Sequence, residues 1–172
     1  ALAAGVLSFT QQPASTGTVE AAFTTQPILS VTDTYGNPKS GVTVDLSDVL
    51  ASDDTTTGAG ALTGTASLVT DAAGLATFTN VGYTKTDTIH IKAVVVSPAL
   101  SAASTTNIAL SGGAPATLTV SGITDPVAAG TPSNVTVTAK DQYGNTAAGY
   151  TGTVAFTSND AQAVLPANYT FL

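Results

Sequence analysis

Short runs in which apolar and polar residues alternate follow one another along this chain, and Gly, Pro, Asn and Asp separate them. Successive side chains of a β-strand point to opposite faces, so each run predicts a strand with one buried face. A sustained 3.6-residue period, which would indicate a helix, is not found in the sequence. The pattern therefore predicts an all-β fold.

Composition supports this fold class. Charged residues make up only 9% of the chain, compared with about 25% in globular proteins generally. Thr fills the polar positions instead, and Glu20 is the only Glu. Thr is β-branched and polar, which suits the solvated face of a sheet. With 43% hydrophobic residues, the chain has enough apolar side chains for a folded core.

Seven strands are predicted in residues 1–110, at 7–9, 29–31, 42–46, 62–69, 75–81, 89–95 and 105–110. Their number and length match an immunoglobulin-like β-sandwich, in which two sheets each bury one face. From their shared parity we expect these side chains inside: Leu7, Phe9, Val31, Val44, Leu46, Phe78, Ile89 and Ile91.

An internal repeat is the most specific signal in the sequence. Asp-Thr-Tyr-Gly-Asn at 33–37 returns as Asp-Gln-Tyr-Gly-Asn at 141–145. The flanking segments 7–9 and 44–46 match 118–120 and 154–156 in the same order. The pentad predicts a turn with Gly36 and Gly144 at positive φ or against a neighbouring segment, and with the Tyr ring packed beneath.

The repeat predicts tandem sandwiches of which the second is incomplete. Residues 1–110 form a complete repeat, 111–115 a Ser-Gly-Gly-Ala-Pro linker, and 116–172 the N-terminal half of a second repeat, with strands near 118–120, 135–139, 154–156 and 169–171. Either the chain is a segment of a longer polypeptide, which we favour because tandem arrays are common, or a neighbouring subunit donates the missing strands.

Four segments carry a resemblance to a known family: Phe-Thr-Gln-Gln-Pro at 9–13, the turn within 31–38, Asp-Ala-Ala-Gly-Leu-Ala-Thr-Phe at 71–78, and the second turn at 141–145. In these the chain resembles the bacterial immunoglobulin-like repeats of invasin- and intimin-type adhesins and large surface proteins. The resemblance implies an array of sandwiches at a cell surface, acting as stalk, spacer or adhesive segment, and no catalytic residues.

Charge and hydropathy exclude several classes of partner. The net charge of −7, with four Lys and Arg absent, lacks the basic surface that nucleic acid or anionic lipid requires. Apolar runs are far shorter than the ~20 residues of a membrane span, so this segment is not expected to insert into a membrane. Cys and Met are absent, which fits an extracellular or cell-surface location.

The sequence offers little for catalysis. His90 is the only His, and its parity between Ile89 and Ile91 predicts that it faces water. A Ser-His-Asp site or a transition-metal site needs further His or Cys ligands, and the carboxylates are scattered rather than paired as in a glycosidase. We therefore expect neither an enzyme nor a cofactor.

Calcium and sugar modification are the remaining possibilities for a site. Asp48, Asp53 and Asp54 are predicted to share one loop with hard oxygen ligands, but they lack an EF-hand spacing and favour a solvated hairpin loop over a metal site. Asn134 and Asn168 begin N-glycosylation sequons.

These observations predict a non-catalytic structural repeat of an extracellular stalk, adhesin or filament, with polymerisation by strand donation between subunits as the less favoured of the two explanations for its incomplete second repeat. Its partners would be neighbouring repeats or copies of itself. The alternatives are a module that binds a surface glycan or host receptor through loops at one end of a sandwich, and a spacer in a secreted multidomain hydrolase. Aromatic platforms would favour binding, but Tyr35 and Tyr143 lie in the repeated turns, where a structural role explains both.

Overall fold

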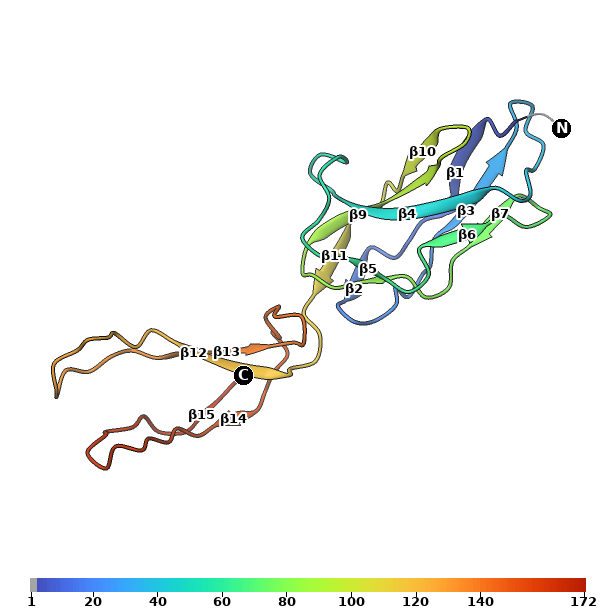
Figure 1. Cartoon of the computed structure of the whole chain (residues 1–172). Helices are drawn as coiled ribbons and strands as arrows, with labels where there is room; N and C mark the ends of the chain where they lie inside the picture. The colour runs from blue at the N-terminus through green and yellow to red at the C-terminus, as the bar shows by residue number, and fades with distance from the viewer. Residues whose placement is uncertain (1–2) are drawn as a thin grey trace. The chain divides into compact units, whose positions relative to one another are not determined.

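A computed structural model describes residues 3–172 and is all-β, with strands and connecting turns (Figure 1). The chain divides into two compact units, and the boundary lies between Gly113 and Ala114. This boundary falls inside the predicted linker 111–115, although Ser111 itself still belongs to the last strand of the first unit.

Eleven strands are described in the first unit: β1 (Val6–Gln11), β2 (Thr16–Thr18), β3 (Ile28–Thr32), β4 (Thr43–Leu50), β5 (Leu62–Thr63), β6 (Ser67–Val69), β7 (Leu75–Thr77), β8 (Gly82–Tyr83), β9 (Thr88–Val95), β10 (Leu100–Ala103) and β11 (Ile108–Ser111). One sheet has the order β1-β3-β7. The other has the order β2-β11-β9-β4-β6, with β10 beside β9, and β5 and β8 form a separate short pair. The unit is a β-sandwich.

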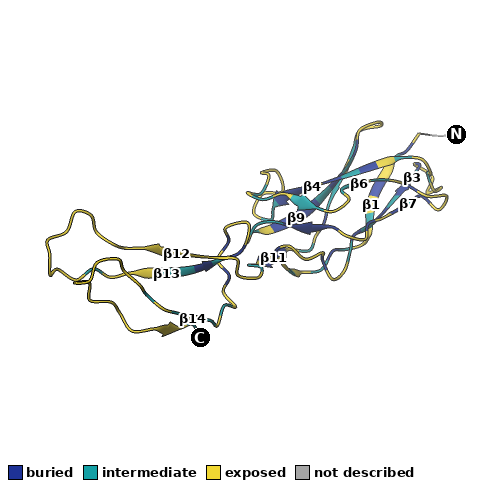
Figure 2. Cartoon of the chain, turned by 60° about the horizontal axis from the view of Figure 1, so that its bottom comes forward, coloured by how far each residue is buried: buried dark blue, intermediate teal, exposed yellow. Residues whose placement is uncertain are grey.

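The apolar faces of the two larger sheets form one core. Seven of the eight residues predicted to lie inside are buried: Leu7, Val31, Val44, Leu46, Phe78, Ile89 and Ile91. Phe9 is only half-buried and packs at the margin of the core, next to a shift in the β1–β3 register between Phe9 and Gln11. Figure 2 shows the buried colour along β4 and β9, at the centre of the larger sheet.

The predicted strand 62–69 is wrong as a single element. It breaks into β5, which pairs with β8, and β6, which pairs with β4. Gly64 lies at the break with a φ of 79°, and the Asn80 side chain accepts the amide hydrogen of Thr65 there at 2.9 Å. The apolar alternation continues across this corner, so the sequence pattern does not mark it.

The predicted strand 75–81 is shorter than expected, since β7 ends at Thr77, and the short β8 that follows it was not predicted. Strands β2 and β10 were not predicted either. β2 consists of Thr-Gly-Thr and has no apolar alternation, but it pairs in parallel with β11, with Gly17 opposite Leu110. β10 is formed by Leu-Ser-Ala-Ala and continues the sheet beside β9. Both strands depend on a neighbouring strand rather than on their own pattern.

The second unit contains β12 (Thr117–Ser121), β13 (Thr136–Lys140), β14 (Thr153–Val154) and β15 (Tyr169–Thr170). All four lie where the sequence predicts strands. β12 pairs with β13 and β14 pairs with β15, both antiparallel, to give two separate two-stranded ribbons.

These ribbons reproduce parts of the first unit in the same register. Leu118 lies opposite Ala139 as Leu7 lies opposite Val31. Val154 lies opposite Tyr169 as Val44 lies opposite Leu68. β12, β13, β14 and β15 therefore correspond to β1, β3, the beginning of β4, and β6. Within residues 114–172, counterparts of β7 and β9 are absent.

Candidate functional site

The repeated pentad forms a tight turn held by its Asp. One carboxylate oxygen of Asp33 accepts hydrogen bonds from the amides of Tyr35 at 2.9 Å and Asn37 at 3.0 Å. The Asp33 carbonyl accepts the amide hydrogen of Gly36 at 3.0 Å. This hydrogen bonding lowers the pKa of Asp33, with the Asn37 side chain as the largest cause. Asp and Asn in such turns satisfy backbone groups that the reversal of the chain leaves unpaired.

The second pentad repeats this geometry. The carboxylate of Asp141 accepts from the amides of Tyr143 at 3.0 Å and Asn145 at 2.8 Å. Gly36 and Gly144 have φ values of 85° and 78°, so the predicted positive φ is confirmed at both. An ideal Cβ at either glycine would touch nothing within 4 Å. The requirement for Gly is therefore conformational rather than steric.

A third turn of the same form follows β6. Asp71 accepts from the amides of Ala73 at 2.8 Å and Leu75 at 2.9 Å. Gly74 has a φ of 73°, and its carbonyl accepts the amide hydrogen of Val31 at 2.8 Å. This turn therefore packs directly against the end of β3, which leads into the first pentad turn.

The predicted packing of the Tyr rings beneath the turns is wrong for Tyr35, which is 77% exposed. Its amide is directed inward to Asp33, which leaves the side chain on the solvent side of the loop. Tyr143 is 39% exposed. Each pentad thus presents an aromatic ring at its surface.

The prediction that His90 faces water is also wrong, because its side chain is buried. Nδ1 contacts the Asp54 carboxylate, and Nε2 lies 2.6 Å from Oδ1 of Asn107. The loop after β4 and the residue before β11 cover the face of β9 that parity assigns to solvent. His90 therefore links the loop after β4 and the segment before β11 to the sheet through these two contacts.

The three carboxylates considered for calcium are not gathered in one loop. Asp48 lies within β4, opposite Ile91, and is buried. Asp53 caps its own loop by accepting from the amides of Thr55 and Thr56, and Asp54 contacts His90. Residues 3–172 bring together no group of three or more His, Cys, Asp or Glu side chains suited to a metal ion.

Asp48 instead belongs to a buried polar cluster that sequence reasoning missed. The Tyr83 hydroxyl lies 3.3 Å from Asp48 and 3.2 Å from Asp87, and it accepts the amide hydrogen of Gly60 at 2.8 Å. Burial of the phenol raises the pKa of Tyr83. These residues come from separate strands and loops, and their spacing gives no signal that they meet.

The sequon residues Asn134 and Asn168 are both exposed, two residues before β13 and directly before β15, respectively. A glycan could be attached at either position without disturbing a core.

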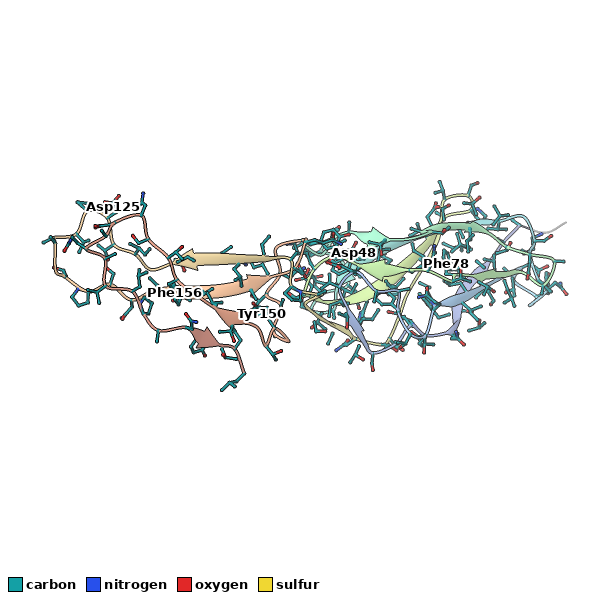
Figure 3. All side chains as sticks on the ribbon, turned by 90° about the horizontal axis from the view of Figure 1, so that it is seen from below. Asp48, Phe78, Asp125, Tyr150 and Phe156 are labelled. Atoms are coloured by element: carbon teal, nitrogen blue, oxygen red, sulfur yellow. The ribbon has the colours of Figure 1, made fainter. Side chains whose placement is uncertain are left out.

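The second unit contains an open groove of about 390 Å³. It lies between the two ribbons and is lined by Val135, Thr136, Val137, Val154, Phe156, Pro166, Ala167, Tyr169 and Phe171. Figure 2 shows the exposed colour over much of β12 and β14, and Figure 3 marks Phe156 in this unit and Phe78 in the first. The groove occupies the place of the core in the first unit.

The described residues form no helix of the length and apolar character that a membrane crossing requires. Comparison with family models, with curated proteins and with solved structures gives no match for this chain.

Proposed function

We propose that this chain is a non-catalytic structural module of an extracellular stalk, adhesin or filament, built from immunoglobulin-like repeats. The observation that carries this proposal is that the two units share strand register and turn geometry, while the second leaves its apolar face open. A repeated unit that exposes an apolar face is suited to association with further units or with copies of the chain.

The polar clusters support a structural role. The Asp residues of the three turns hydrogen-bond within their own turns, while His90 and Tyr83 each hydrogen-bond to a neighbouring loop of the first unit. Such bonds satisfy buried polar groups and fix loops. In this proposal they serve stability, and association is the activity.

Electron microscopy and sedimentation of the intact chain test this proposal over a range of protein concentration. We expect linear assemblies or concentration-dependent association. The Phe156→Asp variant, which places a charge in the groove, should reduce association, and Thr157→Asp, on the exposed neighbour, should not. A chain that stays monomeric at all concentrations would contradict the proposal.

A second candidate is a glycan- or receptor-binding module, which the exposed ring of Tyr35 specifically favours. Exposed aromatic rings provide flat apolar surfaces with a polar end, a common feature of binding sites. A glycan array probed with the intact chain tests it. Specific binding that Tyr35→Ala abolishes and Tyr83→Phe preserves would favour this candidate over a purely structural role.

A further inference from the structure

The free edge of β13 corresponds to an occupied edge in the first unit. There β7 pairs antiparallel with β3, with Leu29 opposite Ala76. Offset by the repeat, the counterpart of Leu29 is Val137. β12 is the only strand that pairs with β13 among the described residues. The edge beyond Val137 therefore presents backbone groups of the kind that recruit an added strand.

The strand that covers this edge in the first unit has a distinctive pattern. Its residues 74–78 read Gly-Leu-Ala-Thr-Phe. Ala76 and Phe78 are each 1% exposed and face the core, whereas Thr77 faces outward. An ideal Cβ at Gly74 would lie 2.7 Å from the Val31 carbonyl and 2.9 Å from the Lys39 amide. A small residue is therefore required where this strand crosses the turn.

The second unit has the same backbone arrangement against which this segment packs in the first unit. The hydrogen bond from the Lys39 amide to the Val31 carbonyl is repeated between the Ala147 amide and the Ala139 carbonyl, both at 2.9 Å. Val135 and Val137 line the groove beside this position. The second unit thus has the same backbone arrangement that, in the first unit, leaves no room for a side chain at Gly74. Beside it lies the apolar groove, at the position where the core of the first unit holds Ala76 and Phe78.

We propose that the groove of the second unit binds an extended segment of the pattern Gly-x-Ala-x-Phe, paired antiparallel to β13. This inference rests on the proposed function, since it names the contact through which modules would associate. The backbone groups at the edge of β13 lie beside the apolar groove, which favours a strand over a small apolar ligand. A small ligand would fill the groove but leave these backbone groups without hydrogen-bond partners. A folded copy of the first unit cannot supply its own β7, because that strand is already paired with β3.

A synthetic peptide of residues 70–81 tests the proposal against the intact, isotope-labelled chain by NMR. We expect saturable shifts of the amides of Val137, Ala139 and Phe156, and intermolecular contacts between the peptide Phe and Val135. Shifts confined to the first unit, or absent throughout, would overturn the proposal.

Matched peptides separate strand pairing from general apolar adhesion. Burial of an unpaired carboxylate is costly, so the peptide with Ala76→Asp should bind at least about tenfold more weakly, whereas Thr77→Asp on the outward face should bind as the parent does. Gly74→Val should also weaken binding. Equal binding of the Ala76→Asp and Thr77→Asp peptides would overturn the proposal.

A chain variant supplies a second test. Phe156→Asp should abolish peptide binding and Thr157→Asp should preserve it, with the β12–β13 amide signals reporting that the ribbon is intact in both. If the chain forms filaments and the peptide does not bind, the structural function stands and this docking site is refuted. If the peptide binds and the chain never associates, the docking site stands and the filament role is refuted.

Discussion

Tyr83 and Asp48 meet inside the first unit, with the phenol oxygen 3.3 Å from a carboxylate oxygen, although 35 residues separate them in the sequence. The loop at 58–60 closes over this contact, because the amide of Gly58 donates to Asp48 and that of Gly60 donates to Tyr83, both at 2.8 Å. An ideal Cβ at Gly60 would lie 2.7 Å from the ring carbon that bears the hydroxyl. The loop is thus shaped around the phenol.

Tyr83→Phe should destabilise the first unit by about 1–3 kcal/mol, because it leaves the half-buried amide of Gly60 and the buried carboxylate of Asp48 without their shared partner. Urea unfolding followed by circular dichroism measures this free energy. Tyr35→Phe is the matched control and should change it by less than about 0.5 kcal/mol, since that ring is exposed. An equally small effect at Tyr83 would contradict a structural role for the cluster.

Phe78→Ala should cost about 3–5 kcal/mol, because removing a large buried ring leaves a cavity. Phe9→Ala should cost less, since Phe9 packs only at the margin of the core. Denaturant unfolding compares the two. A loss below about 0.5 kcal/mol for Phe78→Ala would refute the core assignment.

Gly36→Ala should destabilise by about 1–2 kcal/mol, the cost of holding an L-residue in the left-handed region, where Gly36 has a φ of 85°. Gly36→Val should cost more because it is β-branched, and Gly36→Asn should cost least. Thermal unfolding ranks the three variants. Equal tolerance of Ala and Val would show that the turn adopts another conformation.

The Asp53 loop should lose stability in acid. The Thr56 hydroxyl and amide, followed by the Thr55 amide, lower the pKa of Asp53 from 3.8 to about 2. A carboxyl whose pKa is lower in the folded state stabilises the fold above its ordinary pKa, and this contribution is lost as the pH falls from about 4 through 2.

NMR titration of the Asp53 side-chain carbon measures this directly. Thr56→Val should raise the pKa of Asp53 towards its ordinary value, whereas Thr57→Val, on the exposed neighbour, should leave it near 2. Identical titrations of the two variants would contradict the assigned hydrogen bonds.

Calcium should leave the melting temperature unchanged, because Asp48, Asp53 and Asp54 serve three different contacts. An ion that binds only the folded state raises the melting temperature. Scanning calorimetry with added calcium and then with a chelator measures this shift. A clear fall on chelation would show a site that these carboxylates do not explain.

Strand positions with strict alternation could be predicted from the sequence. Residues 89–95 and the four strands of the second unit lie where apolar parity indicates, since a single buried face imposes that parity. β2 could not be predicted in this way, because its Thr-Gly-Thr sequence is stabilised by pairing with β11. The positive φ of Gly36 followed from the recurrence of one pentad.

Side chains that depend on loop packing could not be predicted. His90 has the parity of a solvated residue, yet Asp54 and Asn107 come from loops that fold back over it. The groove of the second unit was predictable only in outline, as an uncovered apolar face. That the β13 edge beside this groove corresponds to the β3 edge paired with β7 could be seen only from the strand register of both units.

The parallel pairing of β2 with β11 has a mechanical consequence. β2 is the second strand of the first unit and β11 is the last, and they run in the same direction, with Thr16 opposite Ala109 and Thr18 opposite Ser111. A force that pulls the two ends apart draws the strands past each other along their length. The hydrogen bonds between them include that from the Val19 amide to the Ser111 carbonyl at 2.9 Å. Under this force they are loaded in shear and must break together, whereas strands pulled apart from one end lose their hydrogen bonds one after another.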